Sequence, residues 1–504
     1  MPERRGGGAP LGRNADRGAG TPPAARARSC SRLDALRKEE SAPPPPSRGA
    51  KARGGADAVP LRTVQGGSGH TVPGARRPHP HPSSIQAVRD WMRAYRAPAV
   101  PGAPRFLGGA AGFWSYDLAR SIERLPQLAV DDLMMPDAMF MRFHQLFVFD
   151  HEAKRLYFCV IKRWEPGAGK LLDVLYGEAE REAEAMRDAW RSWRLDEPDA
   201  KSAAREALWS NIPDAARLRT GAEAWPDLHI DFPEEDYKAA VRRIQEYIRA
   251  GDVFQVNLAL RQHRVLRSAP TEIYEWLRMI NPSPYMGMIR MPGLEIVSGS
   301  PELLVRLERG RVSTRPIAGT RRRGFDAEEE TRFLRELREN EKERAEHIML
   351  VDLLRNDIGR IARYGSVRVS ELMTIESYSH VMHLVSQVEG ELAEGLDGFD
   401  VIRAVFPGGT ITGAPKIRTM EIIEELEPVR RGLYTGSIGW IDYTGDMEFN
   451  IVIRTLVVKD GIGYVQAGAG IVIDSSPERE YKESLNKARA LWKAIELSER
   501  EGTT

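Results

Sequence analysis

Alternation of apolar and polar residues predicts antiparallel β-sheet in much of the second half of the chain. The alternating runs are joined by short turns such as Asp460-Gly461, which is typical of strands with one buried face. Long helical patterns lie between and after them. The strand-like runs are residues 252–265, 285–291, 294–300, 303–319, 433–445, 448–461 and 462–473.

The first half of the chain has a different pattern. Glycines precede a helix-like run in 106–126, and MFMRFHQLFVFD followed by RLYFCVIKRW predicts two strands joined at a turn. Residues from 165 to about 230 combine Glu, Ala and Arg at helical spacing with polar stretches, which indicates a surface helix and a linker. A further helix is expected from Pro233 to Gly251, where the glycine suits the C-cap.

Strands and helices thus form separate blocks, which favours the α+β class, with antiparallel β-sheets sandwiching helices. A doubly wound parallel sheet is not expected. No G-x-G-x-x-G or P-loop pattern opens a helix.

Composition separates the first 84 residues from the rest. They contain 15 Lys and Arg against 6 Asp and Glu, have no Phe, Trp, Tyr or Ile, and include four consecutive prolines at 43–46. Such a segment cannot bury enough apolar surface to offset its ordering entropy, so we expect residues 1–84 to be a disordered basic tail rich in Gly, Pro and Arg. Because no aromatic residue is available for base stacking, no nucleic-acid partner is expected.

The remaining bulk properties indicate a cytoplasmic enzyme. The 504 residues are 42% hydrophobic, yet no apolar run approaches the roughly 20 residues that cross a bilayer, so no membrane partner is expected. Two cysteines, Cys30 and Cys159, cannot make a disulfide framework, which favours a reducing compartment.

Two helices each carry a pair of glutamates three residues apart, Glu343 with Glu346 and Glu480 with Glu483. This spacing puts each pair on one helix face, and both faces continue into apolar residues. Buried carboxylates need a neutralising partner, and Mg²⁺ suits an oxygen-only site. Either pair alone is much more often a solvated helix face than a metal site.

Several long strings resemble the chorismate-utilising enzymes, which include anthranilate synthase component I, aminodeoxychorismate synthase component I, isochorismate synthase and salicylate synthase. The resemblance extends from about Pro233 to Leu497, with weaker similarity from Phe106 to Trp164. It implies a chorismate-binding-enzyme fold, with a partial N-terminal anthranilate-synthase-like region and linker at 85–230 and a chorismate-binding catalytic domain at 231–504. The strings are EHIMLVDLLRNDIGRI, ESYSHVMHLVSQVEG, FPGGTITGAPKIRTMEIIEELEPVRRG and QAGAGIVIDSSPEREYKESLNKARA.

The resemblance also implies ligands for Mg²⁺ and for chorismate. Glu346 and Glu483 match the metal ligands, with Glu343 and Glu480 as an outer pair. Arg454 and Tyr434 match the residues that hold the enolpyruvyl carboxylate, and an arginine can bind a carboxylate with two hydrogen bonds. Further substrate contacts are expected from Gly468 and Gly470, whose lack of a side chain lets backbone N–H groups approach, and from Lys487, Thr410 and Gly319.

The same resemblance implies the catalytic groups. Glu302 matches the general acid that protonates the departing C4 hydroxyl, which requires a raised pKa. His383 matches the active-site histidine near that hydroxyl, although a lone histidine on an apolar helical run is more often a buried core residue. Thr320 matches a hydroxyl on the substrate side. Gln255 stands where water-using members carry a basic lysine, so ammonia is the expected nucleophile.

Ala318 leaves two amination reactions open. Some aminodeoxychorismate synthases have a lysine at this position, which attacks C2, whereas alanine is usual in anthranilate synthases. Other strings, including QVNL at 255–258 and TGSIGWIDYTGDMEFNIVIRTL, are similar to the aminodeoxychorismate branch. We therefore expect aminodeoxychorismate synthase component I, which makes 4-amino-4-deoxychorismate. The alternatives are anthranilate synthase component I and a non-catalytic chorismate-binding homologue.

The source of ammonia is expected to be a separate glutamine amidotransferase subunit. Glutamine hydrolysis needs an activated cysteine nucleophile. Cys30 lies in the expected tail and Cys159 in a strand-like run, so neither is placed for that role.

Overall fold

The computed structural model describes residues 58–61, 83–165, 167, 171–193, 200–211, 225, 227–377 and 381–501. Most of the expected tail at 1–84 lies outside these residues. Within it, Ala58–Leu61 forms strand β1, which pairs with β3, and Ser84 opens helix α1. The prediction of disorder is therefore wrong for residues 58–61 and for Ser84.

Ten strands form one large sheet in which every pair is antiparallel. The order is β1-β3-β2-β16-β17-β10-β11-β14-β12, and β13 pairs with β14. The sheet joins strands from both sides of the expected boundary at 230/231. The bounds are Ala58–Leu61 for β1, Gly109–Trp114 for β2, Ala138–Phe143 for β3, Leu303–Glu308 for β10, Arg311–Arg315 for β11, Ile317–Arg322 for β12, Arg368–Ser377 for β13, Val381–Glu391 for β14, Ser437–Asp442 for β16 and Met447–Asn450 for β17.

A second sheet has seven strands in the order β15-β7-β19-β18-β9-β8, with β6 paired to β7, and β4 and β5 form a separate hairpin. The bounds are Gln145–Asp150 for β4, Arg155–Val160 for β5, His229–Ile230 for β6, Gln255–Val265 for β7, Tyr285–Met291 for β8, Leu294–Ser300 for β9, Gly413–Ala414 for β15, Thr455–Lys459 for β18 and Ile462–Ile471 for β19.

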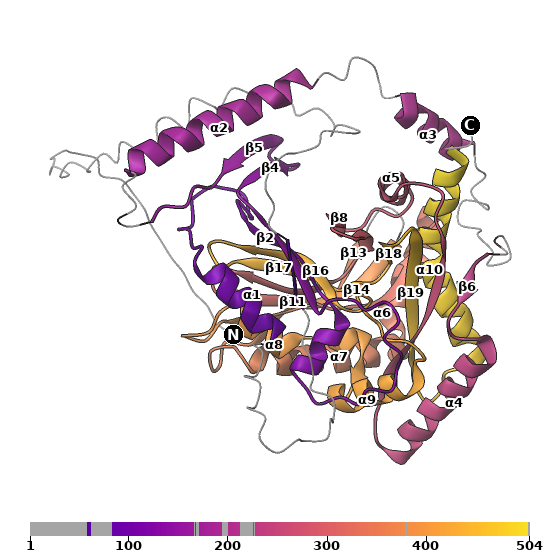
Figure 1. The fold of residues 1–504 in the computed structure, drawn as a ribbon. Helices are drawn as coiled ribbons and strands as arrows, with labels where there is room; N and C mark the ends of the chain where they lie inside the picture. The colour runs from indigo at the N-terminus through magenta and orange to yellow at the C-terminus, as the bar shows by residue number, and fades with distance from the viewer. Residues whose placement is uncertain are drawn as a thin grey trace, which may run out of the picture.

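Helices surround these sheets (Figure 1). Gly251, with φ of 84°, ends α4 in the left-handed conformation, as expected from the sequence. The helix bounds are Ser84–Arg93 for α1, Leu172–Ser192 for α2, Ala200–Ser210 for α3, Glu234–Ala250 for α4, Pro270–Ile280 for α5, Ala327–Glu339 for α6, Glu341–Gly359 for α7, Gly398–Val405 for α8, Lys416–Leu426 for α9 and Pro477–Glu501 for α10, with short 3₁₀ turns η2 at Tyr116–Ser121 and η5 at Gly409–Ile411.

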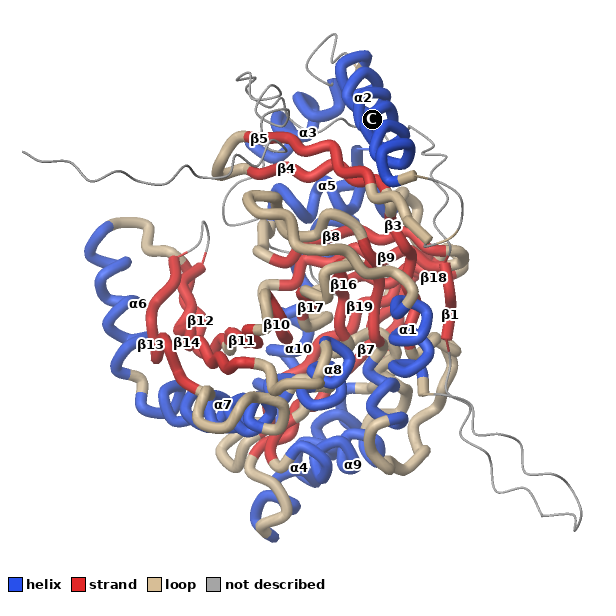
Figure 2. Tube along the Cα trace, turned by 90° about the vertical axis from the view of Figure 1, so that its left-hand side faces the viewer, coloured by secondary structure: helices blue, strands red, loops and turns tan. Residues whose placement is uncertain are grey.

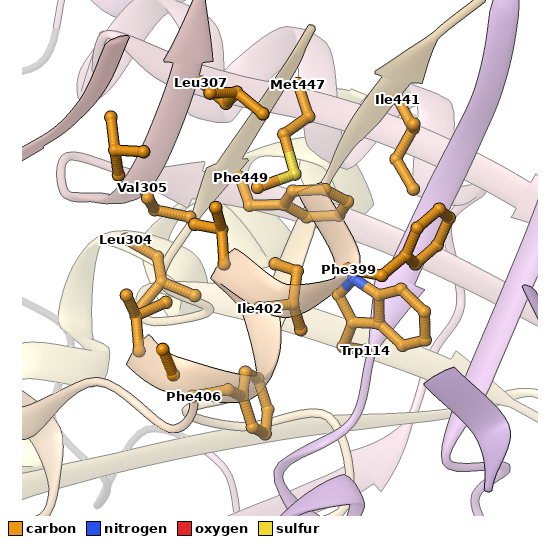
Figure 3. Close-up of a cluster of buried hydrophobic side chains, with 14 of the residues drawn as sticks. Trp114, Leu304, Val305, Leu307, Phe399, Ile402, Phe406, Ile441, Met447 and Phe449 are labelled. Atoms are coloured by element: carbon orange, nitrogen blue, oxygen red, sulfur yellow. The ribbon is translucent and has the colours of Figure 1, made fainter. Parts of the chain in front are cut away.

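The two large sheets pack against each other through a shared apolar cluster. Phe113 of β2 and Met139 of β3 meet Ile296 of β9 and Val457 of β18 there. The outward faces are covered by helices, as in the cluster where Phe399 and Ile402 of α8 lie among side chains of β10 and β17 (Figure 3). The α+β class with antiparallel sheets and packed helices is thereby confirmed.

Two local predictions differ from the structure. The run MFMRFHQLFVFD divides into β3 and β4, which belong to different sheets, because the chain leaves the large sheet after Phe143. The run around His383 is strand β14 and not a helix. The surface helix expected after residue 165 is confirmed as α2, which buries no residue. In the part of the chain that is described, no helix is long and apolar enough to cross a membrane.

Two groups of elements carry the candidate site residues. Helix α6 packs on β12, and α7 contacts both β12 and β14 (Figure 2). Helix α10 runs along β19 and α5. The side chain of Asn340 caps α7 by accepting a hydrogen bond from the Glu343 N–H at 3.0 Å, which fixes where the first glutamate pair begins.

Candidate active site

Glu302 lies in the turn between β9 and β10 and is only 8% exposed. Thr410 Oγ1 donates a hydrogen bond to its Oε1 at 2.8 Å. Burial raises the pKa of Glu302 to about 7, while the Thr410 bond and the positive charges of Arg454 and Lys487 act in the opposite direction. A carboxyl with this pKa is partly protonated at neutral pH, so it can donate a proton.

Pairing between the segment after η5 and strand β7 holds Thr410 in place. The Asn257 N–H donates to the Thr412 carbonyl at 2.9 Å, and Gly413 is in register with Val256. Arg431 Nη1 adds a bond to the Ile411 carbonyl at 2.9 Å. The hydroxyl that contacts Glu302 is thus positioned by β7 and by a buried arginine.

His383 lies on β14 directly opposite Thr320 of β12. Thr320 Oγ1 and His383 Nδ1 are 2.9 Å apart, and the imidazole is 3% exposed. Burial lowers the pKa of His383, and the charge of Arg454 lowers it further. The histidine is therefore neutral at pH 7 and able to exchange hydrogen bonds without carrying charge.

Ala318 and Gly319 form an irregularity in the pairing of β12 with β14. Gly319 has φ of 60°, a left-handed conformation that favours glycine, and a Cβ there would lie 2.7 Å from Leu337 Cδ1 and 2.8 Å from Glu343 Oε2. Ala318 pairs with Leu384 and is partly exposed. This loop therefore lies against the helix that carries the first glutamate pair.

Glu346 of α7 and Glu483 of α10 lie close enough for their charges to interact, and Glu343 and Glu480 lie on the same two helices. Burial raises the pKa of Glu346, the charge of Lys342 lowers it, and the charges of Glu343 and Glu483 raise it. Burial also raises the pKa of Glu480, again with a contribution from Glu483. Mutual repulsion of this kind shows that the two helix faces bring negative charge together.

The donor chemistry of these glutamates fits a hard divalent cation. Glu343 accepts a bond from Arg321 on Oε1 at 2.8 Å, while its buried Oε2 has no partner among the described residues. All four side chains offer only oxygen, which Mg²⁺ prefers. Within the described ranges, however, no three acidic, histidine or cysteine side chains are close enough together to hold a metal.

Arg454 lies directly before β18, and Tyr434 lies between α9 and β16. Arg454 adopts φ of 50° and its carbonyl accepts a bond from the Gly299 N–H at 2.9 Å, so the chain turns sharply before β18. Burial lowers the pKa of Arg454, and Glu302 partly offsets that effect. Tyr434 is 8% exposed, burial raises its pKa, and its ring lies 5.6 Å from the guanidinium of Arg431.

Lys487 connects the second glutamate pair to the glycines of β19. Its Nζ pairs with Glu483 Oε1 at 2.9 Å and donates to the Gly468 carbonyl at 2.9 Å. A Cβ on Gly470 would lie 2.3 Å from Gln255 Nε2, and one on Gly468 would lie 2.5 Å from the Leu258 carbonyl. Gly468 is therefore required by the backbone of β7, whereas a side chain at Gly470 would displace the Gln255 amide.

Sequence reasoning did not assign two residues that organise this site. Arg431 is 3% exposed, pairs with Glu427, and donates through Nη2 to the Asn257 carbonyl at 2.7 Å. Asn257 is part of the QVNL string, but no role was expected for its side chain. Its position could have been recognised from the sequence, because Asn257 is polar and lies two positions after Gln255, on the same face of the strand.

A pocket of about 350 Å³, including its open mouth, lies at the edge of the cluster between the sheets. Tyr434 and Arg431 line it together with Thr455 of β18 and Gln466 of β19. None of the glutamates described above lies in its wall.

Comparison with known proteins identifies the family of this chain. Residues 59–493 match the model of the family described as chorismate binding enzyme. The chain is 47% identical over 457 residues to aminodeoxychorismate synthase component 1 of Bacillus subtilis, covering 89% of this chain and 91% of the relative. It is 50% identical over 399 residues to anthranilate synthase component 1 of Thermus thermophilus, covering 79% and 80%.

A solved structure shares the fold as well. The crystal structure of anthranilate synthase component I from Streptococcus pneumoniae superposes with a TM-score of 0.66 at 30% identity, covering 91% of this chain and 96% of the other. The family match extends over most of the sequence and includes every residue assigned above to the candidate site. The chain therefore belongs to the chorismate binding enzyme family.

Proposed function

We propose that this chorismate-utilising enzyme aminates chorismate with ammonia in a Mg²⁺-dependent reaction that gives 4-amino-4-deoxychorismate, in the cytoplasm. The observation that carries the proposal is the buried carboxyl of Glu302, whose pKa is raised to about 7 beside Thr410. An ordinary glutamate would be almost fully ionised at neutral pH and could not serve as a proton donor.

Glu302 would act as the general acid at the C4 hydroxyl. In the overall reaction the C4–O bond breaks, the oxygen leaves as water with a proton from Glu302, ammonia supplies the nitrogen of the new C–N bond, and that nitrogen loses a proton. Neutral His383, bonded to Thr320, would hold the departing hydroxyl without competing as a charged group.

Mg²⁺ would be held by Glu346 and Glu483, with Glu343 and Glu480 orienting its water ligands. When bound, the ion would neutralise the crowded carboxylates and bind the ring carboxylate of chorismate. The unpartnered Glu343 Oε2 and the raised pKa of Glu346 support a cation at this place.

Basic groups would hold the second carboxylate of the substrate. Arg454 and Tyr434 would bind the enolpyruvyl carboxylate, and Lys487 would add positive charge from α10. The lowered pKa of Arg454 supports this role, because a partly buried cation gains from an anionic ligand.

Ammonia is favoured over water as the nucleophile. Gln255 is a neutral amide that cannot remove a proton from water. Burial raises the pKa of Cys159, the cysteine within the described residues, to about 11, which opposes a role as the nucleophile in glutamine hydrolysis. A separate glutamine amidotransferase subunit would therefore supply ammonia, and the names of the relatives as component 1 agree with a second component.

Amination at C4 is favoured by the extent of the Bacillus subtilis match, which covers 89% of the chain. Amination at C2, which would give anthranilate, is the second candidate. It is favoured by Ala318 and by the 50% identity to the Thermus thermophilus relative over a shorter span.

Product analysis separates the two reactions. Purified protein is incubated with chorismate, Mg²⁺ and excess ammonium at alkaline pH, with and without an added aminodeoxychorismate lyase. We expect 4-aminobenzoate only when the lyase is present. Anthranilate formed without the lyase would contradict C4 amination and support the second candidate.

A further inference from the structure

Arg321 follows Gly319 and Thr320 on β12 and ties that strand to the helix with the first glutamate pair. Its Nη1 donates a hydrogen bond to Glu343 Oε1 at 2.8 Å. Both side chains are 22% exposed, so the pair is partly shielded from solvent and its charges are less screened than those of a surface pair. No role has been assigned above to this arginine.

The two carboxylate oxygens of Glu343 have different surroundings. Oε1 accepts the bond from Arg321, whereas Oε2 is buried and has no partner among the described residues. Oε2 lies against the main chain of Gly319, because a Cβ there would be 2.8 Å away. Buried polar atoms are almost always satisfied in native proteins, so Oε2 is open to a further donor or cation. Arg321 thus fixes one oxygen and leaves the other available.

Arg321 also reaches the helix that precedes α7. Its Nε lies 3.7 Å from Glu336 Oε2 on α6. The two helices meet at Asn340, which is the C-cap of α6 and the N-cap of α7. A guanidinium can contact several acceptors at once, so Arg321 contacts carboxylates on both sides of this corner. These contacts hold the first turn of α7 against β12.

The same segment of β12 holds the histidine of the candidate site. Thr320 Oγ1 lies 2.9 Å from His383 Nδ1, and the Gly319 backbone also forms a hydrogen bond with the imidazole. Residues 319–321 therefore contact the histidine on one side and Glu343 on the other. Loss of the Arg321 contact would release Glu343 without removing any group that contacts His383.

We propose that Arg321 is a positioning residue for the Mg²⁺ site, holding Glu343 by Oε1 so that Oε2 is left to orient a water ligand of the ion. This inference rests on the proposed function, in which Glu343 belongs to the outer pair of glutamates. Arg321 acts through Glu343 and touches neither the ion nor chorismate. Groups that orient metal ligands in this way commonly change metal affinity by about 10- to 100-fold when they are removed.

A role of Arg321 through charge alone would have the opposite effect. A guanidinium near a cation site repels the ion, so its removal would tighten Mg²⁺ binding. The observed contact favours positioning, because Arg321 occupies Oε1 and does not compete for the buried Oε2. The direction of the change in affinity therefore separates the two roles.

The test measures Mg²⁺ binding by isothermal titration calorimetry in the absence of chorismate. Arg321→Met keeps the aliphatic stem and removes the donors, and we expect it to raise the Kd for Mg²⁺ about tenfold. Arg321→Lys keeps a charged donor and should restore most of the affinity. Arg322→Met is the matched control, since the neighbouring arginine pairs with Glu329 of α6 at 2.6 Å and should leave the Kd unchanged.

A double-variant cycle tests whether Arg321 acts through Glu343. Glu343→Gln alone should weaken Mg²⁺ binding, because the carboxylate is lost. Adding Arg321→Met to Glu343→Gln should then weaken binding by no more than about twofold, since the contact has already been removed. If Arg321 acted through general stability, the two losses would multiply. The cycle is read from calorimetry and from the Mg²⁺ concentration for half-maximal turnover with ammonium.

The outcomes are distinguishable. An unchanged or lower Kd for Mg²⁺ in Arg321→Met, or a loss that multiplies with that of Glu343→Gln, would overturn the positioning role while leaving chorismate amination intact. Wild-type protein that aminates chorismate equally well without Mg²⁺ would instead reject the proposed Mg²⁺-dependent reaction, and the role of Arg321 with it.

Discussion

Glu302 and the glutamates of α7 and α10 have the same side chain in contrasting surroundings. Glu302 is 8% exposed, and the charged groups that act on it, Arg454 and Lys487, are positive. The Glu483 side chain is 52% exposed and pairs with Lys487. Glu346 is affected by Lys342 and also by the carboxylates of Glu343 and Glu483, so several carboxylates lie together here among lysines. The region around Glu302 therefore contains one buried carboxyl group, whereas the region between α7 and α10 contains several carboxylates.

Under the proposed function, the two regions have different roles. Burial dominates the raised pKa of Glu302, and its positive neighbours keep that pKa near neutrality, which suits proton transfer. Around Glu346, the like charges would be relieved by a cation, which suits metal binding. The two regions should therefore respond differently to amide substitution and to added Mg²⁺.

The largest effect is expected from Glu302→Gln. The amide keeps the shape and can still accept the Thr410 bond, but it cannot donate a proton as an acid does. We expect kcat to fall by about 10²- to 10⁴-fold, with the KM for chorismate little changed. Steady-state assays over a range of Mg²⁺ concentrations measure this, and no concentration should restore activity. A loss smaller than about tenfold would show that Glu302 is not the proton donor.

A smaller and metal-dependent effect is expected from Glu346→Gln. Removing one carboxylate weakens the cation site, so the Mg²⁺ concentration for half-maximal activity should rise by about 10- to 100-fold, and excess Mg²⁺ should recover part of kcat. Glu341→Gln, an exposed glutamate at the start of the same helix, is the matched control. If Glu346→Gln and Glu341→Gln needed the same Mg²⁺ concentration for half-maximal activity, Glu346 would not be a metal ligand.

Much of the fold follows from sequence pattern, because alternation and turn residues report which face of a strand is buried. Strands β7, β8, β9 and β19 and helix α4 lie close to where the pattern places them. The division of 139–150 between β3 and β4 could not be predicted, because the apolar run is continuous and only tertiary packing decides which sheet each half joins.

The residues of the candidate site could be proposed from the sequence only because long motifs resemble those of a known family. Glu302 and Thr410 are 108 residues apart, and no local pattern indicates that they share a hydrogen bond. The pKa of Glu302 depends on burial and on charges contributed by distant segments, so it also had to await the structure. Arg321 was overlooked because its bond to Glu343 joins a strand to a helix across 22 residues and is a property of the folded chain.

The smallest expected effect concerns stability, and it tests the environment of Glu302 without any substrate. The folded-state pKa of about 7 is above the ordinary value of 4.5, so between these pH values the native protein holds a proton that the unfolded chain releases. Stability from this group is therefore complete below pH 4.5 and is lost as the pH rises through 7, by about 3 kcal/mol at most. Glu302→Gln cannot ionise and avoids this loss.

Urea denaturation at pH 5 and pH 8 should show the variant gaining stability relative to wild type at the higher pH, whereas Glu341→Gln should show no such change. A difference independent of pH would mean that Glu302 ionises as an ordinary surface glutamate does, and the contrast between the two regions would disappear.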